Sequence, residues 1–174
     1  MQKRHTDWES YFGEQSQTSK NYYIPYIKEV IGHIPDKVLE VGCGEGGNLL
    51  PFAEAGCRVM GVDIDATRIE QARTFFAQRH QQGQFIATDI FQLKDKATNF
   101  PLILLHDVIE HIRDKERFLS GLQKHLSADG AIFVGFPAWQ MPFGGQPPRR
   151  YPPATLFHIS LFSTSFPALY TDGY

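Results

Sequence analysis

The sequence is poor in cysteine, in long apolar runs and in excess positive charge. Its two cysteines, Cys43 and Cys57, have neither the spacing of a metal site nor the number needed for a disulfide framework. No apolar run reaches the roughly 18–20 residues that span a bilayer, and residues 1–10 lack the apolar core of a signal peptide. We therefore expect a cytoplasmic protein without a membrane partner.

The charges of the chain are nearly balanced. Its 17 Lys and Arg stand against 19 Asp and Glu, which gives a formal net charge of -2 over 174 residues. Proteins that bind nucleic acid cluster Lys and Arg against the phosphates, and Arg149–Arg150 is too small a cluster for that. The composition therefore argues against a nucleic-acid partner, and the length predicts a single domain with its own core.

Short apolar runs alternate with helical patterns in the middle of the chain. Strands are expected at 37–41, 58–62, 84–87, 102–105 and 131–135, with helices at 46–54, 65–79 and 114–126. Helical crossovers between strands produce a parallel sheet covered on both faces. The pattern predicts an α/β fold, with a Rossmann-like doubly wound parallel sheet in a three-layer α/β/α arrangement.

The alternating pattern defines a core at residues 37–139, and the two ends of the chain do not share that pattern. Residues 1–36 are expected to form a polar arm or lid and then an amphipathic helix from Asn21, on the side where a substrate enters. Residues 138–174 hold six prolines and show neither a helical nor a strand period. We expect an irregular tail at 140–174, truncated or frame-shifted, with the C-terminal strands missing or atypical. The tail, a partner chain or a dimer would then have to cover the exposed apolar edge of the sheet.

A glycine-rich loop follows the first expected strand. Gly42, Gly44 and Gly47 match the pattern G-x-G-x-x-G, and Asp63 ends the next strand about twenty residues further on. The glycines permit a tight turn and a close approach of the backbone to a ligand. Asp63 can accept hydrogen bonds from ribose hydroxyls, so the pattern indicates a nucleotide-like ligand.

Glu40 lies two residues before the first glycine of that loop. A carboxylate there repels the pyrophosphate of a dinucleotide such as NAD, whereas it attracts a positively charged ligand. With Gly46, the order becomes acidic-x-Gly-x-Gly-x-Gly, which favours S-adenosylmethionine (SAM) with its sulfonium and amino groups. An NAD-linked oxidoreductase is the weaker alternative.

The stretch from Val38 to Arg73, VLEVGCGEGGNLLPFAEAGCRVMGVDIDATRIEQAR, resembles motif I and its continuation in class I SAM-dependent methyltransferases. It is most similar to the small-molecule branch that includes the ubiquinone-biosynthesis O-methyltransferases, and the resemblance extends to about Trp139. The resemblance implies SAM as the cofactor and methyl transfer to an oxygen, nitrogen or carbon atom of a small-molecule substrate. The unusual tail leaves a non-catalytic SAM-binding or interaction module as an alternative.

The resemblance also implies a role for residues at each strand end. The residues expected to bind the methionine part of SAM are Glu40, Gly42, Cys43, Gly44 and Asp107. Asp63 is expected to bind the ribose. Ile64, Asp89 and Ile90 are expected to contact the adenine. Aromatic walls for the substrate are expected from Tyr11, Tyr22 and Trp139.

His106 and His111 follow the fourth expected strand and have three interpretations. His106 is a candidate catalytic general base. Asp107, Glu110 and His111 could hold a divalent ion, as in some quinone-pathway relatives, although their close spacing disfavours it and no metal is expected. The third interpretation is structural, with hydrogen bonds to the local backbone.

Overall fold

The structure, a computed structural model, describes residues 7–93, 97–137, 157–163 and 166–169. The N-terminal part consists of α1 (Trp8–Thr18), the π-helical turn η2 (Ser19–Tyr23) and α2 (Ile24–Ile31). The core then runs through β1 (Lys37–Val41), η3 (Gly47–Leu49), α3 (Leu50–Glu54), β2 (Arg58–Asp63), α4 (Ala66–Gln78), β3 (Gln84–Ala87), η4 (Ile90–Gln92), β4 (Phe100–His106), η5 (Ile109–His111), α5 (Lys115–Leu122), η6 (Gln123–His125) and β5 (Leu126–Pro137). Two further strands follow, β6 (Phe157–Ser163) and β7 (Phe166–Leu169).

One sheet joins all of the described strands, in the order β3-β2-β1-β4-β5-β6-β7. The strands β1 to β5 pair in parallel, which confirms the predicted Rossmann-like fold class. The strand order reverses between β1 and β4, and such a reversal opens a crevice at the carboxyl ends of the strands. The fold therefore fixes where a ligand site is expected.

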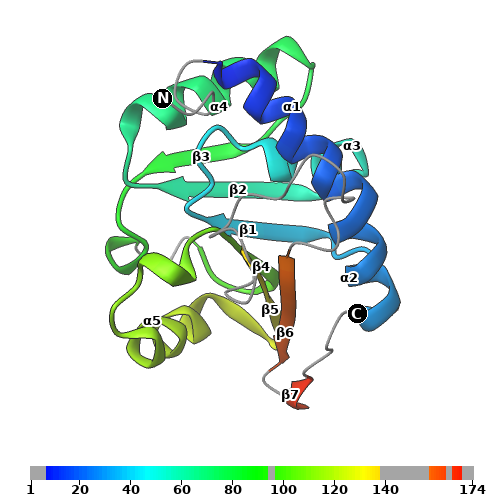
Figure 1. Cartoon of the computed structure of the whole chain (residues 1–174), viewed down its shortest axis with the longest axis vertical. Helices are drawn as coiled ribbons and strands as arrows, with labels where there is room; N and C mark the ends of the chain where they lie inside the picture. Colours follow the sequence, from blue (N-terminus) through cyan, green and yellow to red (C-terminus); the bar gives the residue numbers. More distant parts are fainter. Residues whose placement is uncertain (1–6, 94–96, 138–156, 164–165, 170–174) are drawn as a thin grey trace.

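Alternate residues of the strands feed two separate cores. Val38, Leu102 and Leu104 join a cluster that also contains buried residues of α1, α2, α3 and α4. Leu39 and Ile103 join a second cluster with residues of α5. Because successive side chains of a strand point to opposite faces, the helices cover both faces of the sheet as predicted. Figure 1 shows α1 and α2 on one side of the molecule and α5 on the other.

The N-terminal segment is more regular than the sequence indicated. A flexible arm or lid was expected up to Ser19, with the helix beginning at Asn21, but helix α1 begins at Trp8 with Asp7 as its N-cap. Phe12 and Tyr23 are buried in the same cluster as the sheet residues. The sequence did not predict α1, because the helix is mostly polar and isolated aromatic residues show little helical periodicity. None of the described helices is both long and apolar enough to cross a membrane.

The C-terminal segment also differs from the expectation, because β6 and β7 lie where no strand was predicted. The strand β6 pairs antiparallel with β5 from Phe157 to Ser163, and β7 pairs antiparallel with β6. The alternation Phe157, Ile159, Leu161 carries the period of a strand, but it is short and lies among prolines. Pro167 is compatible with β7, since β7 is an edge strand.

Candidate functional site

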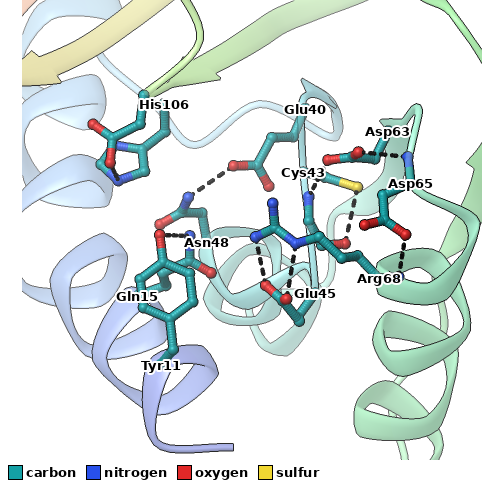
Figure 2. A network of polar contacts seen from close by, with 12 residues as sticks. Tyr11, Gln15, Glu40, Cys43, Glu45, Asn48, Asp63, Asp65, Arg68 and His106 are labelled. Carbon is teal, nitrogen blue, oxygen red and sulfur yellow. Dashed lines mark hydrogen bonds and ion pairs between the residues drawn. The ribbon is translucent and has the colours of Figure 1, made fainter. Parts of the chain in front are cut away.

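The carboxyl ends of β1, β2 and β4 meet at one edge of the sheet, beside the reversal of the strand order. The residues at these ends are most of those that the sequence predicted for a ligand. Figure 2 shows Glu40, Asp63 and His106 there, around the glycine loop of residues 42–47. Ligands of open α/β sheets bind at this edge.

The glycine loop has a backbone that other residues adopt with difficulty. Gly42, Gly44 and Gly46 have φ angles of 73°, 51° and 80°, in the left-handed region. A Cβ atom on Gly44 would lie 2.2 Å from Nη2 of Arg68, and one on Gly42 would lie 2.4 Å from Cγ2 of Val108. The glycines are therefore required both by the turn and by its close packing.

Glu40 is a buried carboxyl group with one unpaired oxygen. Only 1% of its surface is exposed. Asn48 donates a hydrogen bond from Nδ2 to Oε1 at 2.8 Å, while Oε2 is buried without a partner among the described residues. Burial raises the pKa of Glu40 to about 8, although the hydrogen bond from Asn48 opposes the shift. A cationic group beside Oε2 would relieve this cost of burial.

Asp63 ends β2 and is held by the backbone of two loops. Its Oδ2 accepts a hydrogen bond from the N–H of Gly44 at 2.8 Å, and its Oδ1 accepts one from the N–H of Asp65 at 2.9 Å. These bonds fix the carboxylate, and its oxygens keep lone pairs for further donors. Asp63 therefore links the ends of β1 and β2 and can still accept hydrogen bonds from hydroxyls.

Sequence reasoning missed an ion pair that braces the same loop. Glu45 is fully buried, and Arg68 donates to its two oxygens from Nε at 2.8 Å and from Nη2 at 2.7 Å. The hydrogen bonds to Glu45 raise the pKa of Arg68, so the guanidinium stays charged. The pair ties the loop after β1 to α4, and no local pattern announces it because its members are 23 residues apart.

His106 lies between Tyr23 and Asp107 at the end of β4. The Tyr23 hydroxyl is 2.9 Å from Nδ1 of His106, and Nε2 of the ring is 3.5 Å from Oδ2 of Asp107. Asp107 has a φ of 53°, and its Oδ1 is buried without a partner in the described part of the chain. The sequence placed His106 and Asp107 at this edge but did not single out Tyr23 as their neighbour.

Helix α1 lies directly against the glycine loop. The carbonyl oxygen of Phe12 is 2.7 Å from the place that a Cβ atom on Gly47 would take. Gln15 donates from Nε2 to the Tyr11 hydroxyl at 3.2 Å, and Figure 2 shows this pair near Asn48. Tyr11 therefore lies near the glycine loop.

The other two aromatic residues predicted for the substrate are Tyr22 and Trp139. Tyr22 is partly buried and packs against the hydrophobic cluster that also contains Phe12 and Tyr23. Trp139 lies outside the described residues.

The residues predicted for an adenine follow β2 and β3, which are adjacent. Ile64 is 82% exposed directly after β2, an unusual position for a large apolar side chain. Asp89 caps η4 by accepting a hydrogen bond from the N–H of Phe91, and Ile90 is buried. The parallel pairing of β2 with β3, in which Asp63 lies opposite Ala87, brings these residues to the same edge of the sheet.

A metal centre finds no support in the geometry. Among the described residues, no group of three His, Cys, Asp or Glu side chains is placed to hold an ion. Glu110 and His111 lie exposed on η5, so the set Asp107, Glu110 and His111 does not converge.

The charged groups at this edge are mainly acidic. Glu40, Glu45 and Asp63 lie near one guanidinium, that of Arg68, which Glu45 already neutralises, and Asp107 lies beside His106. Two of these carboxyl groups, Glu40 and Asp107, have a buried oxygen without a partner among the described residues. The arrangement suits a ligand with positive charge and N–H donors, and it would repel phosphate groups.

Comparison with known proteins identifies a family for the part of the chain that contains this edge. A family model described as a methyltransferase domain matches residues 39–132. The chain belongs to that methyltransferase family. The resemblance to class I SAM-dependent methyltransferases that the sequence suggested is thereby confirmed.

Individual relatives cover the same region. The chain is 36% identical over 98 residues to a ubiquinone biosynthesis O-methyltransferase of Bartonella quintana and 34% identical to one of Brucella ovis. Each match covers 56% of this chain, and the chain spans only 40% of the length of those relatives. The fold resembles PKMT2 from Rickettsia typhi in complex with AdoHcy, with a TM-score of 0.59, 29% identity, and coverage of 70% of this chain and 26% of that one.

Proposed function

We propose that this protein binds SAM at the carboxyl ends of β1, β2 and β4 and transfers its methyl group to a small-molecule acceptor. The observation that carries the proposal is the buried, unpaired Oε2 of Glu40 beside the glycine loop. SAM presents an ammonium and a sulfonium, which favour a carboxylate neighbour. The pyrophosphate of NAD is negatively charged and offers Glu40 no cation to favour its ionised form, which speaks against an oxidoreductase.

Each predicted residue has a role in this proposal. Glu40 and Asp107 offer carboxyl oxygens to the positive end of SAM, and Gly42, Cys43 and Gly44 let the ligand approach the backbone. Asp63 accepts hydrogen bonds from the ribose hydroxyls. The adenine lies against exposed Ile64, near Asp89 and Ile90. The AdoHcy named for the Rickettsia typhi protein supports the same class of cofactor.

The chemistry asks little of the protein beyond alignment. SAM supplies a methyl group that its sulfonium already activates. The chain positions the acceptor in line with that methyl group and excludes water, and α1 over the glycine loop suits the second task. A general-base role for His106 stays a prediction.

An oxygen atom is the favoured acceptor, because the similar curated proteins are named O-methyltransferases. Tyr11, Tyr22 and Trp139 are proposed as aromatic walls for the substrate, with Tyr11 the best placed. A cytoplasmic location, a dimer and the absence of a nucleic-acid partner stay predictions.

Calorimetry with SAM and with NADH tests the cofactor. SAM should bind and NADH should not, while binding of NADH alone would contradict the proposal. Incubation with methyl-labelled SAM and a fractionated metabolite extract then tests transfer. Label in a small molecule supports the enzyme, whereas SAM binding without transfer to any fraction favours the non-catalytic SAM-binding module.

A further inference from the structure

The π-helical turn η2 is connected to both carboxyl groups that have an unpaired buried oxygen, Glu40 and Asp107. One residue lies between the turn and each carboxyl group. Ser19 donates from Oγ to the carbonyl oxygen of Asn48 at 2.8 Å, and Asn48 in turn donates to Glu40. Tyr23, four residues after Ser19, meets His106, which faces Asp107. Single π-helical turns of this kind occur frequently at functional sites.

The Tyr23–His106 contact is tightly enclosed. Tyr23 is 1% exposed and its ring packs on Phe133, with 4.8 Å between the centroids. A Cβ atom on Gly135 would lie 3.2 Å from Nδ1 of His106 and 3.6 Å from the Tyr23 hydroxyl. Gly135 of β5 therefore leaves room for this pair, and its carbonyl oxygen accepts the N–H of Asp107 at 3.0 Å.

Either group of this contact can donate, and the carboxylate beside the ring favours the direction in which Tyr23 donates. Burial raises the pKa of Tyr23 far above its ordinary value, so the hydroxyl keeps its proton and can donate it to Nδ1. With Tyr23 as the donor, Nδ1 has no hydrogen of its own, and the proton of the ring is on Nε2. That hydrogen faces the carboxylate of Asp107. A carboxylate can only accept hydrogen bonds, so its neighbour has to be a donor.

We propose that Tyr23 is a positioning residue of the SAM site, because its hydroxyl fixes the His106 ring with Nε2–H toward Oδ2 of Asp107. Oδ2 then faces Nε2 of His106 at 3.5 Å, and the buried Oδ1 remains for the positive end of the ligand. This inference rests on the proposed function, and it gives His106 an orienting role.

Nuclear magnetic resonance of ¹⁵N-labelled histidine in the ligand-free protein tests the tautomer independently of SAM. His106 should be in the Nε2–H form in the wild type and should shift toward a mixture of forms in Tyr23→Phe. His125, which contacts the Ala97 carbonyl oxygen elsewhere in the fold, should be unchanged. Tyr26→Phe is the matched control, since Tyr26 also packs against Phe133.

Calorimetry with S-adenosylhomocysteine on the same folded variants gives the second readout. Tyr23→Phe should bind about five- to tenfold more weakly, as expected for one lost hydrogen bond that orients a charged group. His106→Asn should weaken binding similarly, and the double variant should be no weaker than His106→Asn alone.

Two results would overturn the inference while leaving the proposed function intact. One is an Nδ1–H tautomer of His106 in the wild type. The other is full affinity for S-adenosylhomocysteine in Tyr23→Phe. Failure of the wild type itself to bind the ligand would instead contradict the proposed function.

Discussion

Asn48 donates a hydrogen bond to one oxygen of Glu40 at 2.8 Å and leaves the other oxygen buried without a described partner. Burial raises the pKa of Glu40 to about 8, so without ligand at neutral pH the group is mostly protonated. A cation beside Oε2 favours the charged form and lowers that pKa. The site is therefore prepared to exchange a proton for a positively charged ligand.

Glu40→Gln should change folding stability and SAM binding in opposite directions. The raised pKa means that protonated Glu40 stabilises the wild type below pH 4.5, and this contribution of up to about 5 kcal/mol is lost as the pH rises from 4.5 through 8. Gln has the same shape and no charge, so denaturant unfolding should show a more stable variant at pH 8 and little difference at pH 5. Calorimetry should show SAM binding weaker by about 2 kcal/mol.

The control for that variant is Glu54→Gln, which neutralises an exposed glutamate on α3. It should alter neither the pH dependence of unfolding nor the affinity for SAM. A Glu40→Gln protein that binds SAM as tightly as the wild type would remove Glu40 from the site.

Asp63→Ala should weaken SAM by about 1.5–3 kcal/mol, because the ribose hydroxyls lose charged hydrogen-bond partners. It should also lower the free energy of unfolding, since the N–H groups of Gly44 and Asp65 lose their acceptor. Asp36→Ala, at the opposite ends of the strands, is the matched control and should keep full affinity. Unchanged SAM affinity in Asp63→Ala, measured by calorimetry, would contradict the assignment.

Arg68→Met should cost about 3 kcal/mol of folding stability, because it leaves the buried Glu45 carboxylate without its cation. The double variant Glu45→Leu/Arg68→Met should recover much of that loss. Arg58→Met removes the exposed pair with Asp36 and should cost less than about 1 kcal/mol. Equal losses for Arg58→Met and Arg68→Met in urea unfolding would show that the loop is not braced by this pair.

The parts of the fold that the sequence predicts well are those with a local periodic signal. The five parallel strands and the helix over Ala66–Gln78 follow from short apolar runs and from apolar residues at helical spacing. Helix α1 and the strands β6 and β7 were missed because their anchors are few, short or placed among prolines. Their stability comes from contacts with distant parts of the chain, which no local pattern carries.

The candidate site also contains residues that the sequence predicts and contacts that it does not predict. Glu40, the glycines and Asp63 were predictable because strand ends of a parallel sheet share one edge and because their spacing is a known motif. The contacts of Asn48 with Glu40, of Arg68 with Glu45 and of Tyr23 with His106 join elements whose relative placement only the folded chain defines. They position the predicted residues without belonging to the motif.

Proton release on SAM binding tests the central claim most directly. Calorimetry at pH 6.5 in two buffers of different ionisation enthalpy measures the protons exchanged, at a pH where the SAM amino group is already protonated. The wild type should release about one proton per SAM bound, because Glu40 changes from neutral to charged. Glu40→Gln should release close to none. Wild-type binding without proton release, or equal release in both proteins, would contradict a carboxylate at position 40 facing a cationic ligand.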